Sequence, residues 1–160
     1  MDELDVSLKM NIEIREAAEL DFDFAFEAKR QAMGPHIISK WVWDEDYQLA
    51  AHKQRWEEKP WFVIEMDDRP IGTVSIHRLE HYVRFGEFYL LSEFQNKGIG
   101  TEILQRFLKE CDDRSEAAVL EYLKWSPVGS LYKRNGFKIT HENKIHFFMK
   151  REPQTTKTKG

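Results

Sequence analysis

The sequence predicts a single α/β domain, because its length suits one domain and its apolar residues follow two different periods. The chain has 160 residues, close to the usual size of one domain. Apolar and polar residues alternate in several short segments, which is the period of a half-buried strand. Elsewhere apolar residues recur every three or four positions, as on one face of a helix. A chain that mixes both periods is expected to pack helices against a sheet.

The first third of the chain predicts one strand and two helices. Residues 10–14 alternate apolar and polar side chains and form the strand. The first helix begins near Asp21 and is expected to end at Gly34 and Pro35, since glycine and proline interrupt helices. The second helix begins near Asp44. Its buried side is expected to comprise Tyr47, Ala50, Ala51 and Trp56.

The connection between these two helices is unusually rich in large side chains. It spans residues 34–43, and it includes His36, Ile37, Ile38, Trp41 and Trp43. Two interpretations stay open at this point. The segment is either a hydrophobic lid over the core or one wall of a substrate pocket.

Three strands are expected after the helices. Residues 61–66 and 72–78 flank the segment 67–70 (DDRP), which is a turn by its composition. Residues 83–91 form the third strand. Because the three strands follow one another directly, they favour an antiparallel meander.

The last third predicts a helix, a strand, a short helix and two closing strands. The first helix begins near Gly100, and a strand follows at residues 118–123. Ser126 is the expected N-cap of the short helix, with Pro127 as its first residue and residues 135–136 as its end. The apolar face of the first helix comprises Ile103, Leu104, Phe107, Leu108 and Cys111. The closing strands are expected at residues 137–140 and 145–150.

Composition argues against several classes of function. The net charge is −4 and the 24 basic residues are scattered, so no nucleic-acid partner is expected. No apolar run reaches the roughly 20 residues of a membrane span, and one cysteine cannot form an internal disulfide, so we expect a cytoplasmic protein without a membrane partner. The six histidines are dispersed, and no metal site is expected. The domain should occupy residues 10–151, after an extension at 1–9 and before a flexible polar tail at 152–160.

The segment from residue 85 to 104 runs from a strand through a glycine-containing turn into the amphipathic helix. Gly98 and Gly100 have no Cβ, so a ligand can approach the backbone closely. The first N–H groups of the helix have no internal partners and suit an anion such as a diphosphate, to which Lys97 adds charge. A plain tight turn is the alternative.

These residues resemble the GNAT superfamily of acyl-CoA-dependent N-acyltransferases. QNKGIG at residues 95–100 matches the family motif [RQ]-x-x-G-x-[GA], and FYLL at 88–91 resembles its bulged fourth strand. SPVGSLYKRNGF at 126–137 resembles its second motif, N-P-x-x-x-x-L-Y-x-x-x-G-F, with Ser126 where the family often has Asn. The resemblance covers residues 10–151. It implies an α/β fold with a mixed, mostly antiparallel sheet of six or seven strands and helices on both faces.

The resemblance also implies an acetyl-CoA site without a metal. Backbone N–H groups of the glycine turn would hold the pyrophosphate, and Leu90 and Leu91 would pair with the pantetheine arm. A backbone N–H near residues 88–90 would polarise the thioester, and the gap between Leu90 and Leu123 would hold it. The expected cofactor-binding residues are Tyr89, Leu90, Leu91, Gln95, Asn96, Lys97, Gly98, Ile99, Gly100, Thr101, Ser126 and Tyr132.

The reaction implied by the resemblance is direct attack of a primary amine on the thioester in a ternary complex. Glu121 and Glu87 are the candidate bases, with His77 as a third, although either carboxylate also fits a solvent-facing strand residue. Tyr132 occupies the position of the family's general acid. Its alternative is a core aromatic residue whose hydroxyl is hydrogen-bonded within the protein.

The acceptor is the least defined part of the prediction. His36, Trp41, Trp43 and Tyr82 are candidates to line its pocket. The acceptor amine belongs to a small molecule or a peptide, and a homodimer is possible because dimers are common among similar proteins. The competing hypothesis is a catalytically weak acyl-CoA-binding module with a sensing or partner-binding role.

Overall fold

The computed structural model describes residues 11–155 of the chain. Seven strands form one mixed sheet in the order β1-β2-β3-β4-β5-β7-β6, in which only the β4–β5 pair is parallel. The strands are β1 (Ile12–Glu16), β2 (Phe62–Met66), β3 (Arg69–Arg78), β4 (Val83–Leu90), β5 (Ala118–Leu123), β6 (Lys138–Glu142) and β7 (His146–Arg151). The helices are α2 (Phe22–Ile38), α3 (Glu45–Glu58), α4 (Ile99–Asp113) and α5 (Gly129–Arg134), with 3₁₀ turns η1 (Glu19–Asp21) and η2 (Ser92–Phe94). The predicted fold class and the order of elements are confirmed.

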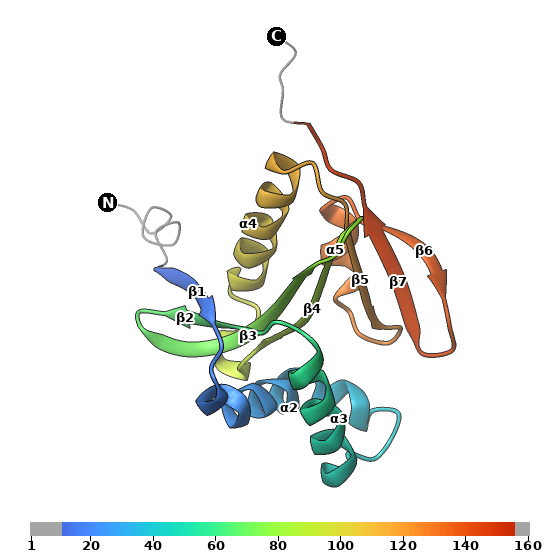
Figure 1. The fold of residues 1–160 in the computed structure, drawn as a ribbon. Coiled ribbons are helices and arrows are strands. Elements are labelled where there is room, and N and C mark those ends of the chain that lie inside the picture. Colours follow the sequence, from blue (N-terminus) through green and yellow to red (C-terminus); the bar gives the residue numbers. More distant parts are fainter. Residues whose placement is uncertain (1–10, 156–160) are drawn as a thin grey trace.

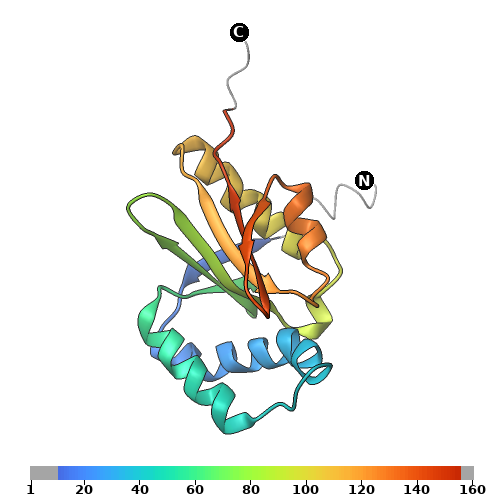
Figure 2. The same ribbon diagram turned by 90° about the vertical axis from the view of Figure 1, so that its right-hand side faces the viewer.

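Helices cover both faces of the sheet, as Figures 1 and 2 show. On one face, α4 buries its apolar side against the strands, and the rings of Phe85 and Phe107 lie 4.7 Å apart. On the other face, α2 packs against β3 and β4, and α3 packs along α2. Phe22, His52 and Trp61 belong to an aromatic cluster between these helices and β2. The helical period of the α4 residues therefore identified its buried face correctly.

Two of the predicted helices differ from their expected form. Helix α2 passes through Gly34 and Pro35 and ends at Ile38. A residue before proline is disfavoured in a helix partly by its Cβ, which glycine lacks, so Gly34 permits the helix to continue. In α3 the buried residue is His52, whereas Tyr47 is 67% exposed and Ala50 is also exposed. The expected buried side of α3 was therefore wrong for Tyr47 and Ala50, whereas Ala51 and Trp56 are partly buried and Trp56 packs against Phe22, His52 and Trp61.

The turns and the helix α5 also correct the prediction in detail. The β2–β3 turn comprises only Asp67 and Asp68, whose φ angles of 53° and 66° suit a two-residue hairpin, while Arg69 already belongs to β3. Helix α5 begins at Gly129 instead of at residue 127. Ser126 does not cap the helix itself, since its Oγ accepts the N–H of Val128 at 3.4 Å in the preceding turn.

The predicted domain limits are described only in part. Met10, the N-terminal extension at 1–9 and residues 156–160 of the polar tail lie outside the described residues. Within the tail, the N–H of Gln154 donates to Asp112 at 2.8 Å. Among residues 11–155, no helix combines the length and the apolar character that crossing a membrane requires.

Candidate active site

A gap opens in the sheet between β4 and β5. The two parallel strands are paired only at Val83 with Ala118 and at Arg84 with Val119, and they diverge beyond these residues (Figures 1 and 2). A cleft of about 940 Å³ lies at this opening. Residues of α2, α3, β4, β5 and α5 line it, together with the start of α4. The cleft therefore joins the segments that the sequence singled out.

A β-bulge in β4 shapes one side of the cleft. The pairing of β3 with β4 shifts between Thr73 and Ser75, and Glu87 has a φ of 44°, unusual for a residue with a side chain. The hydroxyl of Thr73 holds the bulge by donating to the carbonyl of Glu87 at 2.9 Å. Because a bulge adds one residue and bends its strand, it turns Glu87 toward α3 and directs β4 away from β5.

The turn before α4 faces the cleft, as expected for a diphosphate site. Gly98 is the N-cap of α4 with a φ of 83°, and Asn96 also has a positive φ of 59°. The residues of this segment that line the cleft are Gln95, Asn96, Gly98, Gly100 and Thr101. Lys97 is exposed outside the cleft, and the side chain of Ile99 belongs to the core. Only the backbone of these two residues remains a candidate for ligand contact.

The end of β4 supports only part of the predicted pantetheine site. Leu90 lines the cleft, and its carbonyl accepts a hydrogen bond from the side chain of Gln95 at 2.8 Å. The N–H of Leu91 donates to Ile71 at 2.9 Å within the sheet, and Leu91 does not line the cleft. These positions favour Leu90 over Leu91 for pairing with the pantetheine, and both assignments stay predictions. Since successive residues of an antiparallel strand direct their backbone groups to opposite sides, those of Leu90 point toward the gap.

Tyr132 lies in the cleft wall with its hydroxyl unpaired. The residue is only 7% exposed, and within residues 11–155 its hydroxyl makes no hydrogen bond. Burial, with a smaller effect from nearby Tyr122, raises the pKa of Tyr132 well above its ordinary value. The phenol therefore keeps its proton at neutral pH and can donate it in a hydrogen bond to a ligand. The alternative, a core tyrosine hydrogen-bonded within the protein, is not what the described residues show.

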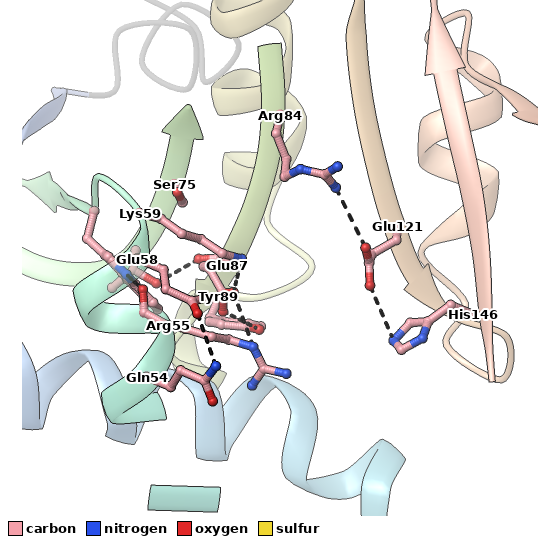
Figure 3. A network of polar contacts seen from close by, with 12 residues as sticks. Gln54, Arg55, Glu58, Lys59, Ser75, Arg84, Glu87, Tyr89, Glu121 and His146 are labelled. Atoms are coloured by element: carbon pink, nitrogen blue, oxygen red, sulfur yellow. Dashed lines mark hydrogen bonds and ion pairs between the residues drawn. The ribbon is translucent and has the colours of Figure 1, made fainter. Parts of the chain in front are cut away.

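Glu121 stands on β5 at the gap, between groups from two other strands (Figure 3). One carboxylate oxygen lies 3.7 Å from Nη1 of Arg84 on β4, and the other lies 3.8 Å from Nε2 of His146 on β7. The side chain is 42% exposed, so water reaches the carboxylate. This open arrangement suits a group that exchanges protons with a ligand or with water.

Glu87 is held far more tightly. One oxygen accepts from Nζ of Lys59 at 2.8 Å and the other from the hydroxyl of Tyr89 at 3.0 Å, while Arg55 lies 3.8 Å away (Figure 3). Burial raises the pKa of Glu87, but the neighbouring cations, Lys59 first, outweigh that effect and leave the pKa below its ordinary value. Glu87 is therefore a permanently charged centre for the cations around it.

The basic residues of this cleft were not predicted from the sequence. Three basic residues line the cleft with Glu87: Lys29 of α2, Arg55 of α3 and Lys59, the C-cap of α3. Two signals in the sequence could have indicated them. Arg55 and Lys59 are four residues apart, a spacing that would place them on one face of a continued helix, although α3 ends at Glu58. Lys29 follows Phe26 by three residues on the apolar side of its helix.

The candidate acceptor residues divide into two groups. His36 and Trp41 line the cleft, and exposed Val42 does so as well, which favours a pocket wall over a lid for this connection. Trp43 lies elsewhere, since its Nε1 donates to Glu45 at 2.9 Å. Two other candidates do not line the cleft. Tyr82 lies beside the guanidinium of Arg84, and His77 pairs with Arg84 across the β3–β4 ladder. Among residues 11–155 no group of His, Cys, Asp and Glu forms a candidate metal site.

Comparisons with known proteins relate both the sequence and the fold to acetyltransferases. A family model described as an acetyltransferase (GNAT) domain matches residues 57–139. PaiA N-acetyltransferase from Thermoplasma acidophilum, solved in complex with coenzyme A, superposes with a TM-score of 0.72 at 20% identity, over 89% of this chain and 99% of its own. PH1933 from Pyrococcus horikoshii OT3 superposes with a TM-score of 0.71 at 20% identity, over 89% of this chain and 99% of its own.

A third structure extends the comparison. The ribosomal-protein-S18-alanine N-acetyltransferase from Escherichia coli superposes with a TM-score of 0.66 at 12% identity, over 92% of this chain and 97% of its own. Identities this low indicate a common fold. No curated protein matches this sequence.

Proposed function

Because the chain belongs to the GNAT acetyltransferase family and has its fold, it is an acyltransferase, and we propose that it moves the acetyl group of acetyl-CoA to a primary amine. The observation that carries this proposal is Tyr132, a nearly buried residue that lines the cleft and whose hydroxyl has no partner among residues 11–155. It lies in the same cleft as the glycine turn of α4 and the gap between β4 and β5. These features together suit a diphosphate, a thioester and a leaving thiolate.

The donor would bind along β4 and at the start of α4. The free N–H groups at the N-terminus of α4 suit the diphosphate, helped by the helix dipole. The backbone of Leu90 would align the pantetheine arm, and its N–H would polarise the thioester carbonyl. The chain's one cysteine, Cys111, is buried away from the cleft, so direct attack by the amine is favoured over an acyl-cysteine intermediate.

Proton transfer would divide between Glu121 and Tyr132. An alkylammonium has a pKa near ~10.4 and must lose a proton before it attacks. Glu121 is the base in this proposal because its carboxylate is open to water at the gap, whereas both oxygens of Glu87 are engaged and its pKa is lowered. The amine nitrogen bonds to the carbonyl carbon, the C–S bond breaks, and Tyr132 gives its proton to the leaving sulfur.

The first test is calorimetric titration with acetyl-CoA, CoA and dephospho-CoA, followed by an amine screen that detects released thiol. Saturable micromolar binding and thiol release would support the proposal. Gly98→Glu, which sets a carboxylate at the diphosphate site, should abolish binding. Absence of binding at millimolar acetyl-CoA would overturn it, and binding without turnover on any amine would indicate a binding module instead.

The two carboxylates are separated by their pH–rate profiles. Glu121→Gln should lower kcat by about 10²-fold and remove the ascending limb of the profile, since a positioned base contributes about that much. Glu87→Gln should mainly change KM for the acceptor. The assignment fails if Glu121→Gln keeps the wild-type profile.

A further inference from the structure

Three cations and one carboxylate gather on the side of the cleft opposite α4. Lys29, Arg55 and Lys59 line the cleft around Glu87, and all four come from α2, the α3 region and the β4 bulge. Figure 3 shows Arg55 and Lys59 beside Glu87. Glu87 compensates one positive charge. With all three cations protonated, this wall therefore carries an excess of two positive charges, although the whole chain has a net charge of −4.

Lys29 is the most unusual member of this cluster. It is only 2% exposed, and within residues 11–155 its ammonium has no hydrogen bond and no ion pair within 4.0 Å. Its environment adds repulsion from Arg55 and Lys59 and attraction from Glu87. A buried cation is costly unless an anion accompanies it, and Glu87 is already bound to Lys59 and Tyr89. An anionic group of a ligand in the cleft would satisfy Lys29.

Beside this cluster, large side chains of the connection between α2 and α3 and of the start of α3 line the cleft, and the polar side chains of Asp44 and Gln48 lie among them. Trp41, Val42 and Tyr47 line the cleft with 48%, 84% and 67% of their surfaces exposed. Large exposed side chains beside a charged cluster suit a ligand with an apolar body and an ionic end. The positive charges of Lys29, Arg55 and Lys59 disfavour simple polyamines, whose charges are all positive.

We propose that the acceptor amine also carries an anionic group, a carboxylate or a phosphate, which binds to Lys29, Arg55 and Lys59. The inference rests on the proposed acetyltransferase function and adds the class of acceptor. An amino acid with an apolar side chain has the required parts: an amine for the thioester, a carboxylate for the cations and an apolar body for the aromatic wall. A phosphorylated amine is the other source of the same chemistry.

The test compares acceptors in matched pairs in the thiol-release assay. L-leucine is set against 3-methylbutylamine, which lacks the carboxylate, and phosphoethanolamine against ethanolamine. In at least one pair, we expect kcat/KM for the anionic acceptor to be at least tenfold higher than for its partner without the anion. A preference in the first pair identifies a carboxylate as the bound anion, and a preference in the second identifies a phosphate. Equal or reversed preference in both pairs would overturn the inference.

Variants then connect this preference to the cluster. Lys29→Met keeps a similar volume without the charge and should lower kcat/KM for the anionic acceptor by about 10-fold to 100-fold, mainly through KM, without lowering it for the amine that lacks the anion. Arg55→Gln, at a half-exposed position, should act in the same direction and covers the case that Lys29→Met does not fold. Lys53→Met, exposed on α3 outside the cleft, is the matched control and should change neither acceptor.

Two further outcomes keep this inference distinct from the proposed function. If Lys29→Met weakens acetyl-CoA itself in the calorimeter, the cluster belongs to the donor site and the inference is overturned, while the acetyltransferase assignment stands. If no acceptor in the panel turns over, the CoA complex is titrated with N-acetyl-L-leucine, N-(3-methylbutyl)acetamide and inorganic phosphate. Tighter binding of an anion than of the neutral amide, lost in Lys29→Met, would support the inference, and equal affinities would overturn it.

Discussion

Tyr132 shows how a single side chain can be both part of the core and part of the site. Its ring lies 5.9 Å from that of Tyr122 and 5.8 Å from that of Phe137, as expected for a packed aromatic residue. The residue nevertheless lines the cleft, and its hydroxyl has no partner among the described residues. Replacing it should therefore alter chemistry with little effect on packing.

Tyr132→Phe tests this separation. We expect kcat to fall by about 10²-fold, because the leaving thiolate loses its proton donor, while the dissociation constant for acetyl-CoA stays unchanged. Steady-state kinetics and calorimetry measure the two quantities. The variant should be at least as stable as the wild type, since no hydrogen bond within the described residues is lost. Wild-type turnover would remove Tyr132 from the mechanism.

The buried positive charge of Lys29 destabilises the folded state by an amount that depends on pH. Burial, then the nearby charge of Arg55, lowers the pKa of Lys29 to about 8 in the folded state, against about 10.5 when exposed, while Glu87 opposes and Lys59 adds to the shift. Below pH 8 both states are protonated and the folded state bears the full cost of the buried charge. Between these two pKa values the unfolded state binds more protons, so stability rises with pH.

Lys29→Met should therefore be more stable than the wild type at pH 7, by up to about 3 kcal/mol from the shift in pKa. The advantage should shrink as the pH rises from 8 toward 10.5. Urea unfolding of both proteins at pH 7.0 and 9.5 measures it, with Lys53→Met as the control whose difference stays near zero. An advantage that does not change with pH would contradict this account of Lys29.

At the scale of elements, one ion pair joins the end of α4 to β7 and α5. Arg151 donates to both oxygens of Asp112 at 2.8 and 3.0 Å, and its Nε donates to the carbonyl of Asn135 at 2.9 Å. The two side chains are 5% and 12% exposed. The hydrogen bonds from Arg151 are the main cause that holds the pKa of Asp112 below its ordinary value. The positive charge of Arg151 adds to this effect.

Asp112→Asn should destabilise the fold by about 3 kcal/mol, because it leaves Arg151 buried without a charged partner. The neighbouring variant Asp113→Asn is the matched control. Asp113 pairs with Lys109 in an exposed contact within α4, and its loss should cost less than about 0.5 kcal/mol. Urea unfolding of the two variants measures the difference, and similar losses in both would contradict the assigned role of Asp112.

At the scale of the whole molecule, the cleft lies between two parts of one sheet. The β4–β5 ladder has only two paired positions, so the halves on either side of it are held together largely by α4 and its core. Both halves line the cleft. A donor bound there would contact both and would stabilise the folded state as a unit.

Acetyl-CoA should therefore raise the melting temperature. At a concentration 100 times its dissociation constant, binding adds about 2.7 kcal/mol to the free energy of unfolding. For a chain of this size that corresponds to a rise of about 5–10 °C. Thermal unfolding with and without acetyl-CoA measures it, and Gly98→Glu should show no shift. A shift of equal size in Gly98→Glu would mean that the ligand binds elsewhere.

Local patterns in the sequence were sufficient for the fold class, the order of elements and the turn before α4. Alternation, helical periods and glycine positions act between near neighbours along the chain, so they can be interpreted without knowing the fold. The same reasoning failed at Pro35 and at the buried side of α3. At Pro35 the helix continues because the preceding residue is Gly34, which has no Cβ. In α3 the buried residues are decided by how the helix packs against the rest of the fold.

The candidate site likewise has parts that could be predicted from the sequence and parts that only the tertiary structure decides. The glycine turn around Gly98 was predicted from local residues, because the backbone that glycine shapes is local, whereas the role of Tyr132 was predicted only from the family resemblance. The distinction between Glu87 and Glu121 could not be predicted, since both are acidic residues of strands. Only the bulge that turns Glu87 toward Lys59, and the gap that leaves Glu121 open, separate them. The cluster of Lys29, Arg55 and Lys59 likewise arises from packing α2 and α3 against β4, because charges far apart in sequence interact only once the fold brings them together.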